Sequence, residues 1–150
     1  MKRIYLILGD SSVGKSSLIR CLTGIRTENR VRLRLIDGSD IYTWCWMRSA
    51  QEQPMDIDEM INQIFEVGEN GFIYYLLPLR LSPAGSCPGY LEYVNALKDN
   101  NCIIENSALL TNNSITINLS PIISPVIIVN SKDNPVNLNA NTVRNSWGWI

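Results

Sequence analysis

The sequence contains no histidine, and this absence removes several kinds of site. Neither a Ser-His nor a Cys-His nucleophile pair is available, and the commonest general acid–base is missing. The four cysteines form no CxxC pair, so a structural zinc site is not expected. Any catalysis must therefore use carboxylates, lysine, a metal ion and the backbone. We expect the cysteines to be buried free thiols: Cys21, Cys45, Cys87 and Cys102.

Long apolar runs and excess charge are also missing. No run approaches the roughly 20 apolar residues of a membrane span, and the run after Met1-Lys2-Arg3 is too short for a signal peptide. The net charge of −1 does not indicate a nucleic-acid partner. We therefore expect a single cytoplasmic domain over residues 1–150, with no membrane span.

The order of hydrophobic patterns in the first forty residues predicts an α/β fold. Residues 3–8 form an apolar run typical of a buried strand, and residues 14–25 carry apolar side chains at helical spacing, with Gly24 as a C-cap. Residues 31–36 then alternate between apolar and polar, as in a strand. A strand, helix and strand in this order favour a right-handed crossover and a parallel sheet.

The rest of the chain continues the alternation of helices and strands. Asp56 and Glu59 have capping-box spacing before an amphipathic helix, and Pro88 follows a Ser-, Pro- and Gly-rich loop and can open another. Asparagine then crowds residues 130–150, which we expect to be irregular or to form a partner-binding tail. Further strands are predicted within residues 72–79, 102–110 and 121–129.

The stretch GDSSVGKSSL, residues 9–18, contains the full pattern G-x-x-x-x-G-K-[ST] between a strand and a helix. Glycine lets the backbone turn tightly, and loop N–H groups with the helix N-terminus attract phosphate. Lys15 is expected at the β- and γ-phosphates, and the Ser16 hydroxyl is expected on Mg²⁺. The predicted nucleotide-binding residues are Gly9, Asp10, Ser11, Ser12, Val13, Gly14, Lys15, Ser16 and Ser17.

These residues resemble the P-loop NTPase superfamily, and residues 9–18 are similar to the first motif of Rab-type small GTPases. That resemblance implies a later Asp-x-x-Gly and a base-reading Asn-Lys-x-Asp. Residues 37–40 lack the final glycine, and residues 130–133 read Asn-Ser-Lys-Asp, with the lysine one place late. We therefore expect Mg²⁺ and ATP (or GTP), with adenine preferred over guanine.

The short stretch from Lys15 to Asp37 favours a fold in which the second strand directly follows the first helix. Residues 35–40 resemble the acidic segments of ParA/MinD-like ATPases and of P-loop kinases. The resemblance implies that Asp37, with Asp40, orients water, contacts the metal or binds a substrate hydroxyl; a solvated turn is the alternative. We predict that Lys15 and Asp37 are catalytic and that Ser16 and Asp37 bind the metal. Arg80 is expected at phosphate or on the surface.

Residues 42–47 are unusually aromatic. On a strand, Tyr42, Trp44 and Trp46 share one face, which would pack in the core or form a protein interface. This segment is the candidate site of a protein partner or of self-association. It could also pack under Trp147 and Trp149.

The combined patterns predict an α/β protein with a mostly parallel P-loop NTPase-like sheet and flanking helices. The expected function is binding of a nucleoside triphosphate, with slow Mg²⁺-dependent hydrolysis. Two alternatives stay open. One is a nucleotide-sensing regulatory or assembly protein without turnover, and the other is a reduced small GTPase-like protein.

Overall fold

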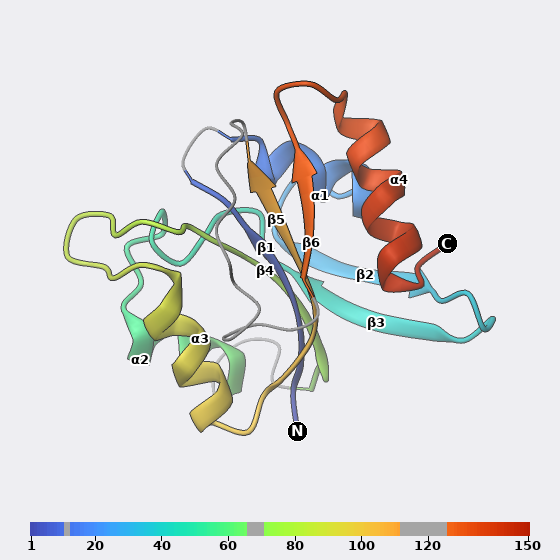
Figure 1. Ribbon diagram of the computed structural model, residues 1–150. Coiled ribbons are helices and arrows are strands. Elements are labelled where there is room, and N and C mark those ends of the chain that lie inside the picture. The colour runs from blue at the N-terminus through green and yellow to red at the C-terminus, as the bar shows by residue number, and fades with distance from the viewer. Residues whose placement is uncertain (11–12, 66–70, 112–125) are drawn as a thin grey trace.

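A computed structural model describes residues 1–10, 13–65, 71–111 and 126–150 (Figure 1). Within these ranges, strands and helices alternate along most of the chain, and the predicted α/β class is confirmed. The elements in chain order are β1 (Arg3–Leu8), α1 (Lys15–Thr23), β2 (Asn29–Arg34), β3 (Asp40–Cys45), α2 (Ile57–Phe65), β4 (Tyr74–Leu79), α3 (Tyr90–Asp99), β5 (Ile103–Thr111), β6 (Val126–Asn130) and α4 (Val136–Trp147).

The strands form one sheet in the order β2-β3-β4-β1-β5-β6. β1 lies in the middle and pairs in parallel with β4 and β5, while β3 joins β4 and β6 joins β5, also in parallel. Leu8, the last residue of β1, is opposite Leu79 of β4 and Leu109 of β5. The carboxyl ends of these strands therefore meet at one edge, where ligands usually gather in open α/β sheets.

The strand predicted at residues 31–36 exists, but the predicted parallel direction is wrong. β2 is antiparallel to β3, with Arg34 opposite Asp40. The two strands are joined by a tight turn, in which Leu35 N–H donates to the Ser39 carbonyl (2.8 Å) and Gly38 has a φ of +89°. A parallel connection would need a crossover of a dozen or more residues, so this short link makes a hairpin.

Two helices cover each face of the sheet (Figure 1). Successive side chains of β1 point to opposite faces, and the two hydrophobic cores divide them accordingly. Tyr5 and Ile7 pack in the core beneath α1 and α4, whereas Ile4, Leu6 and Leu8 pack beneath α2 and α3. β1 is thus buried on both sides, which holds the residues that follow it at a fixed place.

Residues 130–150 are not an irregular tail, because most of them form α4, which packs against α1. The many asparagines concealed the apolar pattern of this helix. Apolar side chains nevertheless recur at helical spacing, at Val136, Ala140, Val143 and Trp147, and the last three are buried. Pro135 precedes its first turn and Gly148 ends it with a φ of +71°. Asparagine is only a moderately poor helix former, so tertiary packing decides the outcome.

Several local predictions are confirmed. Glu59 N–H donates to Asp56 Oδ1 (2.8 Å), which is the expected N-cap of α2. Gly24 has a φ of +76° and ends α1. All four cysteines are free thiols, and all but the half-buried Cys21 are buried. None of the helices in the described ranges has the length and apolarity to cross a membrane.

The aromatic segment 42–47 is divided between the core and the surface. Trp46 is buried beneath α2 and α3, Trp44 packs edge-on against Phe72, and Tyr42 is 58% exposed. The tryptophans of the segment do not share a core with the C-terminal tryptophans, although Cys45 and Met47 do. Trp147 and Trp149 instead contact Tyr5 of β1, with ring centroids 5.2 and 4.9 Å away.

Candidate phosphate-binding site

The loop between β1 and α1 requires glycine at both glycine positions of its pattern, Gly9 and Gly14. A Cβ atom on Gly9 would lie 2.7 Å from Val13 Cγ1 and 2.9 Å from the Leu110 carbonyl oxygen, so no side chain fits there. Gly14 has a φ of +102°, which other residues rarely adopt. These constraints bring the two ends of the loop together over the end of β1. Of the predicted loop residues, Ser11 and Ser12 lie outside the described residues.

The N-terminus of α1 has features that favour a bound anion. α1 begins at Lys15, and within the described residues Gly14 supplies no side-chain cap and the first turn contains no acidic residue. The first N–H groups of a helix have no partner within it and carry a partial positive charge. This end of α1 is therefore suited to an anion such as phosphate.

Lys15 is buried beneath the loop, with 6% of its surface exposed. Its ammonium donates to the carbonyls of Gly9 (2.7 Å) and Asp10 (2.9 Å), which holds it inside the curve of the backbone. Burial lowers the Lys15 pKa below its ordinary value; the Glu52 carboxylate opposes this effect, and Arg80 adds to it. The structure thus contains a partly desolvated cation in the position that the sequence pattern assigns to phosphate binding.

The neighbours of Lys15 in the loop have defined contacts. The Ser16 hydroxyl donates to the Met47 carbonyl (3.0 Å), just beyond β3. The Asp10 carboxylate accepts hydrogen bonds from the N–H and hydroxyl of Ser82, at 3.2 and 2.6 Å. Asp10 was predicted among the nucleotide-binding residues, but its side chain instead ties the loop to the segment after β4.

Asp37 does not lie at this site, and its predicted role in catalysis and metal binding is wrong. It is exposed in the β2–β3 turn, and β3 starts at the sheet edge opposite the end of β1. Its carboxylate accepts from the hydroxyl and N–H of Ser39 at 2.6 and 2.9 Å, and these bonds lower the Asp37 pKa. Asp40 pairs with Arg34, 3.0 Å away. Both acids therefore behave as residues of a solvated turn.

The carboxylate that the fold brings to Lys15 is Glu52, which the sequence patterns did not single out. Glu52 Oε1 is 4.0 Å from Lys15 Nζ, and the Glu52 side chain is 35% exposed. A turn after β3 positions it, with Glu52 N–H donating to the buried Ser49 hydroxyl (3.1 Å). The sequence signal was weak because Glu52 does not directly follow an apolar run, although it lies beyond the carboxyl end of a strand.

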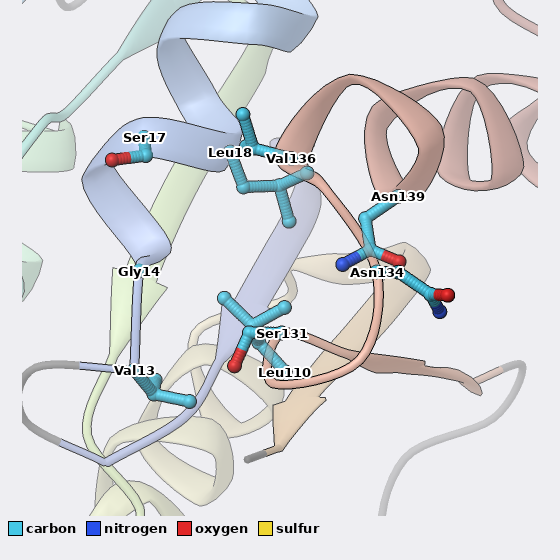
Figure 2. Close-up of a pocket in the computed structure, with 9 residues that line it drawn as sticks. All are labelled: Val13, Gly14, Ser17, Leu18, Leu110, Ser131, Asn134, Val136 and Asn139. Carbon is cyan, nitrogen blue, oxygen red and sulfur yellow. The ribbon is translucent and has the colours of Figure 1, made fainter.

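A cavity of about 230 Å³ opens on the other side of the loop, towards β5 and β6 (Figure 2). Its lining combines apolar side chains with neutral hydroxyl and amide groups, and none of the described residues that line it is acidic. It is smaller than a typical whole-ligand site of roughly 300–1,000 Å³, and suits one ring system of a larger ligand. The lining residues are Val13, Gly14, Ser17, Leu18, Leu110, Ser131, Asn134, Val136 and Asn139.

Asp133, the acid expected in a guanine-reading motif, does not line this cavity. Its carboxylate accepts a hydrogen bond from the Asn130 side-chain amide (3.0 Å), and the residue is exposed. The same Asn130 side chain accepts from the N–H groups of Lys132 and Asp133, which closes the turn after β6. Asn134 and Ser131 face the cavity in its place.

A magnesium ion fits this donor set only together with phosphate oxygens. The described residues contain no group of three or more Cys, Asp or Glu side chains that could hold a metal ion. Mg²⁺ in nucleotide sites is usually held by one or two protein ligands, phosphate oxygens and water. Ser16 would supply the hydroxyl ligand, and phosphate oxygens and water would supply the others.

Comparison of the chain with family models, with curated proteins and with solved structures gives no match.

Proposed function

We propose that this protein binds a nucleoside triphosphate with Mg²⁺ at the loop between β1 and α1. The observation that carries the proposal is the buried Lys15 ammonium, which is enclosed by the loop carbonyls and lies at the uncapped end of α1. A buried cation and a set of unpaired helix N–H groups are both stabilised by a bound phosphate group. The residues that take part are Gly9, Val13, Gly14, Lys15 and Ser16, and the proposal extends to Ser11 and Ser12.

The positions of the cavity and of Glu52 suggest how the nucleotide lies. The cavity is on the β5–β6 side of β1, whereas Glu52 follows β3, on the other side. A nucleotide lying across the end of β1 would place its base in the cavity and its terminal phosphate towards Glu52. Ser17, which lines the cavity, would then lie near the sugar and base end.

Slow hydrolysis would depend on Glu52. With Asp37 at the opposite edge, Glu52 and Asp10 are the two described carboxylates whose charge acts on Lys15, and the Asp10 carboxylate is occupied by Ser82. Glu52 would orient or deprotonate the attacking water, while Mg²⁺, held by Ser16 and the phosphates, would neutralise charge on the leaving group.

Nucleotide sensing without turnover is the second candidate. It is favoured by the contacts of Gln51, the buried polar residue that precedes Glu52. The Gln51 amide donates to the carbonyls of Arg80 and Pro88 and accepts from Arg80 N–H, so it serves the fold and not a water molecule. A sensor would bind the nucleotide and release it unchanged.

A thermal-shift series tests the proposal. Mg-ATP or Mg-GTP should raise the melting temperature of the wild-type protein, whereas Mg²⁺ alone should not. Ligand at a hundredfold excess over Kd stabilises the folded state by about 2.7 kcal/mol. Lys15→Ala should show no shift, and Lys98→Ala, at an exposed lysine near the end of α3, should respond like wild type.

Absence of any shift in wild type would reject nucleotide binding. Phosphate release above the Lys15→Ala background separates the enzyme from the sensor.

A further inference from the structure

Arg80 lies directly beside the start of the phosphate loop. It follows Leu79, the last residue of β4, and β4 is the neighbour of β1 in the sheet. The Gly9 N–H donates to the Leu79 carbonyl (3.2 Å), so the chain leaving β4 and the chain entering the loop are still hydrogen-bonded at this point. Arg80 therefore stands at the edge where the carboxyl ends of the parallel strands meet.

The backbone of Arg80 is fixed by a buried amide. Gln51, which is 4% exposed, accepts from Arg80 N–H (3.2 Å) and donates to the Arg80 carbonyl (3.1 Å). The second donor bond of Gln51 reaches the Pro88 carbonyl (3.2 Å). Burying a primary amide is unfavourable unless its groups are paired, and two of the three Gln51 hydrogen bonds go to the backbone of Arg80. This arrangement fixes the backbone from which the Arg80 side chain projects.

The side chain of Arg80 has a buried group without a partner. Its Nε atom is buried and makes no hydrogen bond, and no ion pair involves Arg80 within the described part of the chain. Its positive charge is close enough to lower the pKa of Lys15. Two neighbouring cations, one of them with a desolvated and unpaired donor, are both stabilised by an anion that contacts the two of them.

We propose that Arg80 is a second phosphate-binding cation, which contacts the terminal phosphate of the nucleotide bound at Lys15. This inference rests on the proposed nucleotide site. The terminal phosphate is assigned because Arg80 and the base-sized cavity lie on opposite sides of β1. A guanidinium fork matches two phosphate oxygens, whereas an ammonium acts as a point charge. Arg80 would thus make the site selective for triphosphates over diphosphates.

Calorimetric titration of wild type and Arg80→Gln tests this contact. The ligands are Mg-ATP against Mg-ADP, and Mg-GTP against Mg-GDP. We expect Arg80→Gln to raise the Kd of the triphosphate by about 10- to 100-fold, since it loses a charge-assisted hydrogen bond, and to leave the diphosphate Kd within about threefold. Arg80→Lys keeps the charge and much of the side-chain stem but not the fork, and should fall between the two. Arg32→Gln, at an exposed arginine of β2, is the matched control.

The outcomes separate this inference from the nucleotide site itself. Equal losses for triphosphate and diphosphate, or an unchanged triphosphate Kd, would overturn the role of Arg80 while leaving the loop at Lys15 intact. If wild type binds neither nucleotide, both proposals fail. If Arg80→Gln does not fold, as judged by its circular dichroism, Arg80→Lys carries the same test, and a triphosphate Kd equal to that of wild type, or an equal loss for both ligands, would reject the contact.

Discussion

The Lys15 ammonium and the Glu52 carboxylate lie 4.0 Å apart, measured from Nζ to Oε1. Lys15 belongs to the first turn of α1 and Glu52 to the turn after β3, two segments that meet only because β3 and β1 run in the same direction. The pair places a cation and a carboxylate together at one edge of the sheet.

If that carboxylate acts in hydrolysis, Glu52→Gln should reduce phosphate release by about 10²-fold or more, the scale of a lost general base. Nucleotide affinity should change little, because the amide keeps the shape of the side chain. Asp37→Asn is the matched control, and its rate should equal that of wild type, because Asp37 lies at the far edge of the sheet. A normal rate in Glu52→Gln, or a large loss in Asp37→Asn, would contradict the assignment.

Gly9→Ala should damage the site through steric overlap. The new methyl group would lie 2.9 Å from the Leu110 carbonyl oxygen, and this backbone atom of a central strand has little room to move. We expect a loss of about 1–3 kcal/mol in the free energy of unfolding, together with weaker nucleotide binding. Chemical denaturation measures the first effect. Gly71→Ala is the control, since its Cβ would meet nothing within 4 Å, and equal stability of the two variants would reject the packing argument.

Adenine should be preferred over guanine, with modest discrimination. Selectivity for guanine needs a buried acceptor for N1–H and the exocyclic amine, and such a match is worth on the order of 10⁴-fold. The cavity offers hydroxyl, amide and apolar groups but no carboxylate, and Asp133 turns towards Asn130. Competition between Mg-ATP and Mg-GTP measures the ratio. Guanine binding a hundredfold tighter, and losing that advantage in Asp133→Ala, would restore the GTPase hypothesis.

Local sequence patterns predicted much of this fold, because interactions between residues close in sequence determine the features concerned. The loop glycines, the Asp56 cap and the apolar run of β4 each have a physical reason within a few residues of sequence. The direction of β2 does not, since it depends on whether the Asp37-Gly38 pair makes a turn or ends a strand before a crossover. The sequence analysis interpreted Asp37-Gly38 as the end of a parallel strand, whereas the pair forms a hairpin turn. The same error placed Asp37 at the site.

Glu52 was missed for a related reason. Glu52 and Arg80 become neighbours of Lys15 through strand order, and strand order follows from the packing of whole layers rather than from a short pattern. Likewise, α4 is stabilised by contacts with α1, and these contacts could not be predicted from its asparagine-rich sequence. Sequence reasoning thus identified the loop and named Arg80 as a candidate, but it missed Glu52.

The buried cysteine thiols should make the free energy of unfolding decrease at alkaline pH. Burial raises the pKa of Cys45 to about 12 and that of Cys102 to about 11, from 9.0. Above pH 9 the unfolded chain loses these protons before the folded protein does, so the free energy of unfolding should fall as pH rises from about 9 to about 12. Denaturant titrations at pH 8 and 10 measure the loss, and Cys45→Ala should show a smaller one. Equal losses in variant and wild type would contradict the assignment to Cys45.

Calorimetric titration of Mg-ATP into wild type, Lys15→Ala and Lys98→Ala tests nucleotide binding at this loop most directly. Wild type and Lys98→Ala should bind one nucleotide each with matching Kd. Lys15→Ala should bind about 100-fold more weakly while keeping its circular dichroism spectrum, because the ammonium supplies charge-assisted hydrogen bonds to phosphate. Equal affinity in Lys15→Ala and wild type would contradict the account, as would the absence of binding to wild type of both Mg-ATP and Mg-GTP.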